Sequence, residues 1–235
     1  GLRDVYKRQG TTILEACRQN GIRIPTLCWL KDINAIGACR ICVVEMTGAR
    51  SLVASCVYPL SKFDEGKNIL THSPAVLQSR KMTLQLLLSD HNMDCLACSR
   101  NGSCELQELC KELGVDDTTF FEGEKNEYDI DYSSKHMFRD NNKCIHCRRC
   151  IAACDKLQGI GVIGANNRGF KTSIDCAFDL DLAETACVSC GQCITACPTG
   201  ALAEKDDTDK VWDALADPEK VVVVQTAPAV RASLG

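Results

Sequence analysis

Hydrophobic positions in this chain come in short runs separated by glycine and polar residues, so the sequence predicts small elements. A first helix begins at Thr12, which can form a capping box with Glu15, and ends at Gly21. Its apolar face carries Ile13, Leu14 and Cys17. Residues 40–45 and 51–58 are rich in valine and isoleucine and flank a glycine-containing turn, which predicts a pair of strands.

A longer helix follows this small mixed α/β domain, which we expect to end near residue 72. Ser73 supplies an N-cap and Pro74 the first helical position. The apolar side of this helix carries Val76, Leu77, Leu84, Leu87 and Leu88. The helix leads the chain towards a group of closely spaced cysteines.

The C-terminal part carries one more helix and an apolar run. Residues 207–217 place Val211, Trp212 and Leu215 at helical spacing and stop before Pro218. Residues 221–225 predict a buried strand, because they are almost continuously apolar. We interpret this run, together with the Thr-Ala-Pro-Ala-Val-Arg that follows it, as the opening of another domain.

Two segments fall outside these elements. Residues 1–9 do not alternate cleanly and run straight into the first helix, so we interpret them as a non-native scar. Residues 116–131 contain seven acidic residues against one lysine and few aliphatic ones. Such a segment is typical of a solvated linker.

The most unusual feature of the composition is its cysteine content, 18 in 235 residues. All but Cys17, Cys110 and Cys176 fall into four tightly spaced groups, which favours metal clusters over the disulfides of a secreted scaffold. No apolar run approaches a membrane span and no signal peptide is evident, so a reducing cytoplasm is expected. The net charge of −4 and the scattered basic residues argue against nucleic-acid binding.

The most specific pattern is a doubled C-x2-C-x2-C-x3-C run, typical of proteins with two 4Fe-4S clusters. In such pairs the fourth cysteine of each run binds the other cluster. One set of ligands is then Cys144, Cys147, Cys150 and Cys197. The other set is Cys187, Cys190, Cys193 and Cys154.

The first cysteine group predicts a 2Fe-2S cluster held by Cys28, Cys39, Cys42 and Cys56. Its spacing is a variant of the plant-type pattern, because ten residues rather than four separate the first two cysteines. A four-cysteine zinc site is the alternative.

The second group predicts another 4Fe-4S cluster and leaves one ligand open. Three thiolates come from Cys95, Cys98 and Cys104, and the fourth ligand is either His91 or Cys110. An imidazole ligand would remove a negative charge and raise the reduction potential. The chemistry of the residues alone does not choose between the two.

The order of these groups resembles the N-terminal electron-input region of multimeric, NAD(P)-linked iron-only ([FeFe]) hydrogenases. The resemblance covers residues 10–235 and rests on three stretches: Gly-Ala-Cys-Arg-Ile-Cys at 37–42, Asn-Gly-Ser-Cys-Glu-Leu-Gln at 101–107 and Gln-Thr-Ala-Pro-Ala-Val-Arg at 225–231. The last stretch is similar to the start of that family's hydrogen-activating domain. The resemblance favours His91 over Cys110 as the fourth ligand.

The resemblance implies an α+β chain of several parts. We expect a β-grasp 2Fe-2S domain at 10–72, truncated because residues 1–9 cannot supply the family's first hairpin. A small helical module at 73–115 would hold the histidine-ligated cluster, and a linker at 116–136 would lead to a two-cluster bacterial ferredoxin-like domain at 137–205. Residues 206–235 would form a linker helix and the start of an α/β hydrogenase domain.

The function implied is an electron relay in an enzyme that reversibly converts protons and hydrogen. Its partners would be flavin-containing, NAD(P)H-oxidising iron-sulfur subunits in a hetero-oligomer, with ferredoxin as a second electron partner. No residue here acts as acid, base or nucleophile, and the motifs for the catalytic H-cluster are expected beyond residue 235. The alternatives are the iron-sulfur region of an NAD-dependent formate dehydrogenase or of the large iron-sulfur subunit of NADH dehydrogenase.

Overall fold

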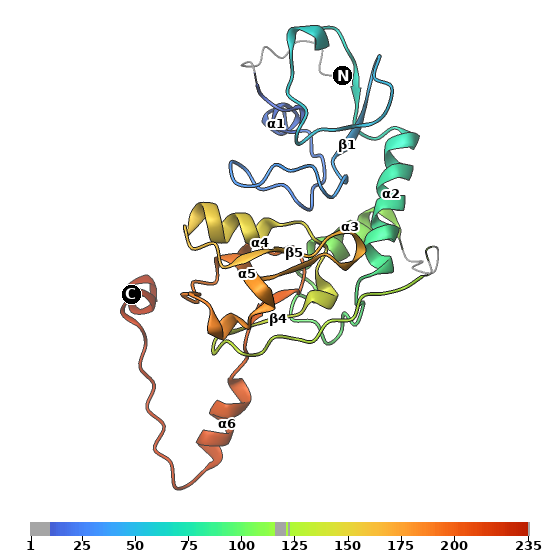
Figure 1. The fold of residues 1–235 in the computed structure, drawn as a ribbon. Helices are drawn as coiled ribbons and strands as arrows, with labels where there is room; N and C mark the ends of the chain where they lie inside the picture. The colour runs from blue at the N-terminus through green and yellow to red at the C-terminus, as the bar shows by residue number, and fades with distance from the viewer. Residues whose placement is uncertain (1–9, 116–120, 122, 235) are drawn as a thin grey trace. The chain divides into compact units, whose positions relative to one another are not determined.

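A computed structural model describes residues 10–115, 121 and 123–234 of the chain (Figure 1). Residues 1–204 and 205–235 form two compact units, which are described separately. The segment interpreted as a scar, residues 1–9, lies outside the described residues.

The first unit opens with a short helix on a small antiparallel sheet. Helix α1 (Ile13–Gln19) starts at the expected capping box, in which the Glu15 amide donates to Thr12 Oγ1 at 3.2 Å and the Thr12 amide donates to the Glu15 carboxylate at 3.0 Å. Amides in its first turn donate to the carbonyls of Tyr58 and Ser55, both at 3.0 Å. These contacts tie the helix to the sheet, since the first amides of a helix have no partner within it.

The sheet has the order β2-β1-β3, with β1 (Val43–Met46) in the centre. The expected strand pair is confirmed but shorter, because β2 spans only Val53–Ala54. Strand β3 (Ile69–Leu70) was not expected, since two residues carry no readable alternation. A single 3-10 turn, η1 (Lys62–Asp64), precedes it.

Helix α2 (Pro74–Ser89) leads from this sheet to the next module (Figure 1). Its N-cap is Ser73 and its buried apolar face is the expected one. The hydrophobic pattern missed Arg80, which is only 1% exposed and donates from Nη2 to the Val43 carbonyl at 2.9 Å. Helix α2 contacts α3 (Glu105–Leu113), which ends at Gly114 in the left-handed conformation.

The rest of the first unit contains two antiparallel sheets of two strands each. Strand β4 (Met137–Arg139) pairs with β7 (Leu202–Glu204), and β5 (Ile163–Asn166) pairs with β6 (Ser173–Cys176). Helix α4 (Arg149–Ala152), which continues as the π-turn η3 (Ala153–Leu157), contacts α5 (Gln192–Ala196). Single 3-10 turns complete this part: η2 (Asn141–Lys143), η4 (Gly169–Lys171), η5 (Ala177–Asp179) and η6 (Leu182–Glu184).

The acidic segment is only partly exposed where it is described, and hydrogen bonds hold it in place. Asn126 donates from its amide and from Nδ2 to the two Asp90 carboxylate oxygens, at 2.7 and 2.8 Å. Tyr128 and Asn142 exchange two hydrogen bonds, at 2.9 and 2.7 Å. These bonds fix the second half of the predicted linker to the end of α2 and to η2.

The second unit corrects one expectation. Helix α6 (Thr208–Ala216) forms where the pattern predicts it, and α7 (Pro228–Leu234) follows later. The predicted buried strand at 221–225 is wrong for this structure, because these residues are extended but unpaired and Val221 is 92% exposed. A strand needs a neighbour for its amides and carbonyls, and none of the described strands pairs with this run.

Candidate metal centres

The four cysteines of the first group come together, and two of them, Cys42 and Cys56, lie next to the end where β1 and β2 pair. Cys28 is hydrogen-bonded to Cys39 and Cys56, and these contacts lower the pKa of Cys28. Cys42 is hydrogen-bonded to Cys56, which lowers its pKa to about 6. All four side chains are buried, from 0% to 7% exposed. The structure thus gathers the whole set, from a loop, a pair and a distant fourth residue.

The second group surrounds a hollow of about 830 Å³ that is lined mainly by the loop at 91–104 and by α3. All candidate ligands line it: His91, Cys95, Cys98, Cys104 and Cys110. His91 Nδ1 is buried without a hydrogen-bond partner, which is costly unless the site offers the imidazole another role. Burial, followed by the nearby Lys143 charge, lowers the His91 pKa to about 4, so its ring is neutral at pH 7.

The doubled run produces two separate small cavities in the ferredoxin-like part. Cys144, Cys147, Cys150 and Cys197 line one, together with Arg139 and Thr199. Cys154, Cys187, Cys190 and Cys193 line the other. The last cysteine of each run, Cys154 or Cys197, thus lines the cavity that contains the first three cysteines of the other run. The two sites lie near each other, since one apolar core contains Cys150 of one and Cys193 of the other.

The two loops that carry these cysteines share left-handed residues on both sides of the second cysteine. His146 and Arg148 flank Cys147 at φ values of 53° and 59°, and Ser189 and Gly191 flank Cys190 at 53° and 72°. Left-handed residues at these places let a short loop curl back on itself. The His146 amide donates to Cys144 Sγ at 3.4 Å, the kind of hydrogen bond that tunes a cluster's potential.

The two arginines after Cys147 differ sharply. Arg149 is 4% exposed and forms a bidentate ion pair with Glu105 at the start of α3, at 2.6 and 2.9 Å. Arg148 is exposed. Arg148 is therefore a solvated charge, whereas Arg149 makes an electrostatic contact with α3.

Further polar contacts join the modules, and sequence reasoning missed them. Arg100 donates from Nη2 to the carbonyls of Ile194 and Cys197, at 2.9 and 3.2 Å. A Cβ atom at Gly200 would collide with Cys98 Sγ. The loop after Cys197 therefore lies against the second cysteine group, and no local sequence pattern predicts this contact.

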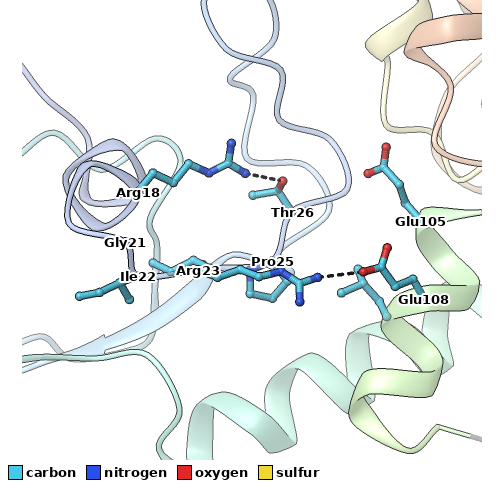
Figure 2. Close-up of a pocket in the computed structure, with 10 residues that line it drawn as sticks. Arg18, Gly21, Ile22, Arg23, Pro25, Thr26, Glu105 and Glu108 are labelled. Atoms are coloured by element: carbon cyan, nitrogen blue, oxygen red, sulfur yellow. Dashed lines mark hydrogen bonds and ion pairs between the residues drawn. The ribbon is translucent and has the colours of Figure 1, made fainter.

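A more open hollow of about 360 Å³ lies between α1 and α3 (Figure 2). Figure 2 shows Arg18 and Arg23 reaching towards it from one side and Glu105 and Glu108 from the other. Arg23 is paired with Glu108 at 3.2 Å, and Glu105 is paired with Arg149. Arg18 lies over the ring of Trp29. This hollow contains none of the cysteines.

The described residues show neither a simple metal-ion site nor a membrane span. No set of three or more histidine, cysteine or acidic side chains among them is arranged to hold a metal ion by itself. No helix in the described part is long and apolar enough to cross a membrane. The assignment of cluster ligands therefore rests on the spacing of the cysteines, on the cavities that they share and on similarity to known proteins.

Three protein families match successive parts of the chain. Residues 3–73 match a 2Fe-2S iron-sulfur cluster binding domain. Residues 80–119 match the NADH-ubiquinone oxidoreductase-G iron-sulfur binding region, and residues 143–201 match a 4Fe-4S dicluster domain. The fold and its cysteine groups thus define an iron-sulfur electron-transfer protein with 2Fe-2S and 4Fe-4S domains.

Individual relatives narrow this class. NADP-reducing hydrogenase subunit HndD of Solidesulfovibrio fructosivorans is 46% identical over 97% of this chain and 39% of its own length. The alpha subunit of an NADPH-Fe(3+) oxidoreductase from Geobacter sulfurreducens is 35% identical over 86% of this chain and 23% of its own length. A solved NAD+-reducing [NiFe]-hydrogenase chain is similar with a TM-score of 0.78 and 30% identity, covering 86% of this chain and 83% of that one.

The chain belongs to the family of iron-sulfur regions shared by subunits of NAD(P)-linked hydrogenases and related NAD(P)H oxidoreductases. The resemblance to NAD(P)-linked hydrogenases is confirmed. The chain spans 39% of the length of the curated hydrogenase relative and 23% of that of the NADPH-Fe(3+) oxidoreductase relative.

Proposed function

We propose that this chain is the electron-input region of an NAD(P)-linked [FeFe] hydrogenase and holds one 2Fe-2S and three 4Fe-4S clusters. Bound clusters would supply one-electron redox chemistry. The observation that carries the proposal is the sorting of the eight cysteines of the doubled run into two cavities that match the crossed pattern.

The proposed ligands are those inferred from spacing. Cys28, Cys39, Cys42 and Cys56 would hold the 2Fe-2S cluster, within a β-grasp domain of which α1 and the three-stranded sheet are part. His91, Cys95, Cys98 and Cys104 would hold the second. The buried, unpartnered His91 Nδ1 supports a ligand role for this ring, which would coordinate in its neutral form.

The chain's own residues would keep these sites dry and fixed. Burial of most of the ligand cysteines excludes water, and backbone amides such as that of His146 stabilise thiolate sulfur. Contacts from Arg100 and Arg149 would hold the second site against the first site of the doubled run. Electrons would then pass between sites without any acid, base or nucleophile from this chain.

The activity and partners belong to the same proposal. A reversible hydrogen reaction would occur outside residues 1–235, at an H-cluster site that the 225–231 stretch would precede. Flavin-containing subunits that oxidise NAD(P)H would exchange electrons with this region, with ferredoxin as a second partner. A relative named as a subunit of an NADP-reducing hydrogenase supports a hetero-oligomer. The specific alternative is an NADH dehydrogenase arm, favoured by the family match of residues 80–119.

Anaerobic reconstitution of the chain tests the proposal. We expect about 14 irons per chain with an equal amount of acid-labile sulfide, from one 2Fe-2S and three 4Fe-4S clusters. A chain that folds with zinc and without sulfide would contradict it. Activity distinguishes the alternatives: the full-length protein should evolve hydrogen from reduced carriers, whereas an NADH dehydrogenase arm should not.

A further inference from the structure

A buried asparagine connects two of the proposed cluster sites. Asn34 is 3% exposed and lies in the loop between Cys28 and Cys39. Its backbone is fixed, because the amides of Leu30 and Asn34 each donate to the other residue's carbonyl, at 2.9 and 3.0 Å. Asp32 turns the loop with a φ of 59°. The backbone position from which the Asn34 side chain extends is therefore fixed.

The Asn34 amide group bridges two modules. Nδ2 donates to the Cys28 carbonyl at 2.7 Å and to the Cys147 carbonyl at 3.1 Å, across 113 positions of sequence. A primary amide nitrogen has two protons, so both donors are used. Both acceptors belong to cysteines proposed as ligands, one of the 2Fe-2S cluster and one of a 4Fe-4S cluster.

Other contacts also join the loop between Cys28 and Cys39 to the ferredoxin-like part. One apolar core contains Leu27, Cys28 and Ile41 together with Ile145 and Cys147. The same loop receives a second bond from the ferredoxin-like part, since Lys156 Nζ donates to the Ile33 carbonyl at 2.7 Å. The first cysteine gap is longer than the plant-type gap, and its extra residues form this contact.

We propose that Asn34 is a positioning residue that holds the 2Fe-2S site at a fixed distance and orientation from the Cys144/Cys147/Cys150/Cys197 site. It would thereby set the rate of electron exchange between the two sites. The inference rests on the proposed iron-sulfur function. Because the amide is neutral, its removal changes geometry and leaves the charge around both sites unaltered. Loss of both donors leaves two carbonyls buried without this partner, which favours separation of the loops.

The test measures magnetic coupling in the full chain with its clusters reconstituted. In the wild-type protein, reduction of the 4Fe-4S cluster at the Cys144/Cys147/Cys150/Cys197 site should speed the spin relaxation of the reduced 2Fe-2S cluster. This change is measured by electron paramagnetic resonance. Asn34→Leu, similar in size but without donors, should lose this enhancement while iron content and both midpoint potentials stay at wild-type values. Asn34→Asp, which keeps the shape, should lose it too.

Lys156→Met is the matched control, because it removes the neighbouring bond of the same loop without touching a cysteine carbonyl. It should keep the enhancement. An Asn34→Leu protein with wild-type enhancement would overturn the inference. So would a wild-type protein whose 2Fe-2S signal never responds to the other cluster, a result that needs no variant to fold. A wild-type chain without any iron-sulfur signal would instead reject the proposed function.

Discussion

At the scale of single residues, Gly200 decides how closely the loop after Cys197 approaches the second cysteine group. A Cβ atom there would overlap Cys98 Sγ, and the nearest other atoms belong to Lys143 and Arg100. Gly200→Ala should therefore displace Cys98 at a cost of about 1–3 kcal/mol. We expect loss of one 4Fe-4S signal, measured by electron paramagnetic resonance and iron content, with the 2Fe-2S signal retained.

Gly164 provides the control for this substitution. It lies in β5 of the same unit, and an added Cβ would meet only the Asp175 carbonyl at 4.0 Å. Gly164→Ala should keep all signals. Equal spectra for the two alanine variants would show that the close approach at Gly200 has no consequence.

His91 and Cys110 line the same hollow, and two variants decide between them. His91→Ala should remove about four irons and one cluster signal, whereas Cys110→Ala should leave both unchanged. His91→Cys should keep the cluster and lower its reduction potential, because thiolate adds the negative charge that imidazole lacks. A redox titration of the three variants gives the answer, and loss of the signal in Cys110→Ala alone would reverse the assignment.

At the scale of elements, α1 depends on its capping box. Thr12 and Glu15 satisfy each other's amides, at 3.0 and 3.2 Å, while Ser73 at the start of α2 accepts a single longer bond of 3.4 Å. Thr12→Ala should destabilise the first domain by about 1 kcal/mol. The measure is the guanidinium concentration at which the 2Fe-2S absorbance is lost under anaerobic conditions.

Ser73→Ala serves as the comparison, since its cap is weaker and lies at the other domain boundary. It should shift the same midpoint less than Thr12→Ala does. A larger shift from Ser73→Ala would mean that the capping box is not what stabilises the first domain.

At the scale of the whole first unit, the ion pair of Arg149 with Glu105 joins the ferredoxin-like part to α3. The Arg149 side chain is 5% exposed and that of Glu105 is 44% exposed, so the pair is partly shielded from water. Arg149→Met should weaken this contact by about 1–3 kcal/mol, since a hydrogen-bonded charge loses its partner. We expect faster amide hydrogen exchange in α3 and unchanged exchange in β1.

Arg148→Met is the control, because the neighbouring side chain is exposed and has the same charge. It should leave exchange in α3 at the wild-type rate. Equal effects of the two variants on exchange in α3 would indicate that the loss of a positive charge matters, and that the ion pair with Glu105 does not.

Much of the local structure could be predicted, because its causes lie within a few residues. The capping box at Thr12, the N-cap at Ser73 and the helix before Pro218 all formed where expected. The failures have physical reasons too. Strand β3 is too short to show alternation, Arg80 is buried only because a distant carbonyl accepts its bond, and the 221–225 run has none of the described strands beside it.

The sequence by itself determined which chemistry this protein can offer: four groups of soft cysteine thiols, spaced as in iron-sulfur sites, in a chain similar to NAD(P)-linked hydrogenase subunits. Spacing determines this because three thiols within one short loop can reach only a common centre. Only the tertiary structure decided how the groups meet. The bonds from Asn34 to Cys147, from Arg100 and from Arg149 join residues that are between 44 and 113 positions apart. The contact of Gly200 with Cys98 likewise joins residues that are distant in sequence. No local pattern encodes such pairs, since packing selects them only after the modules have folded.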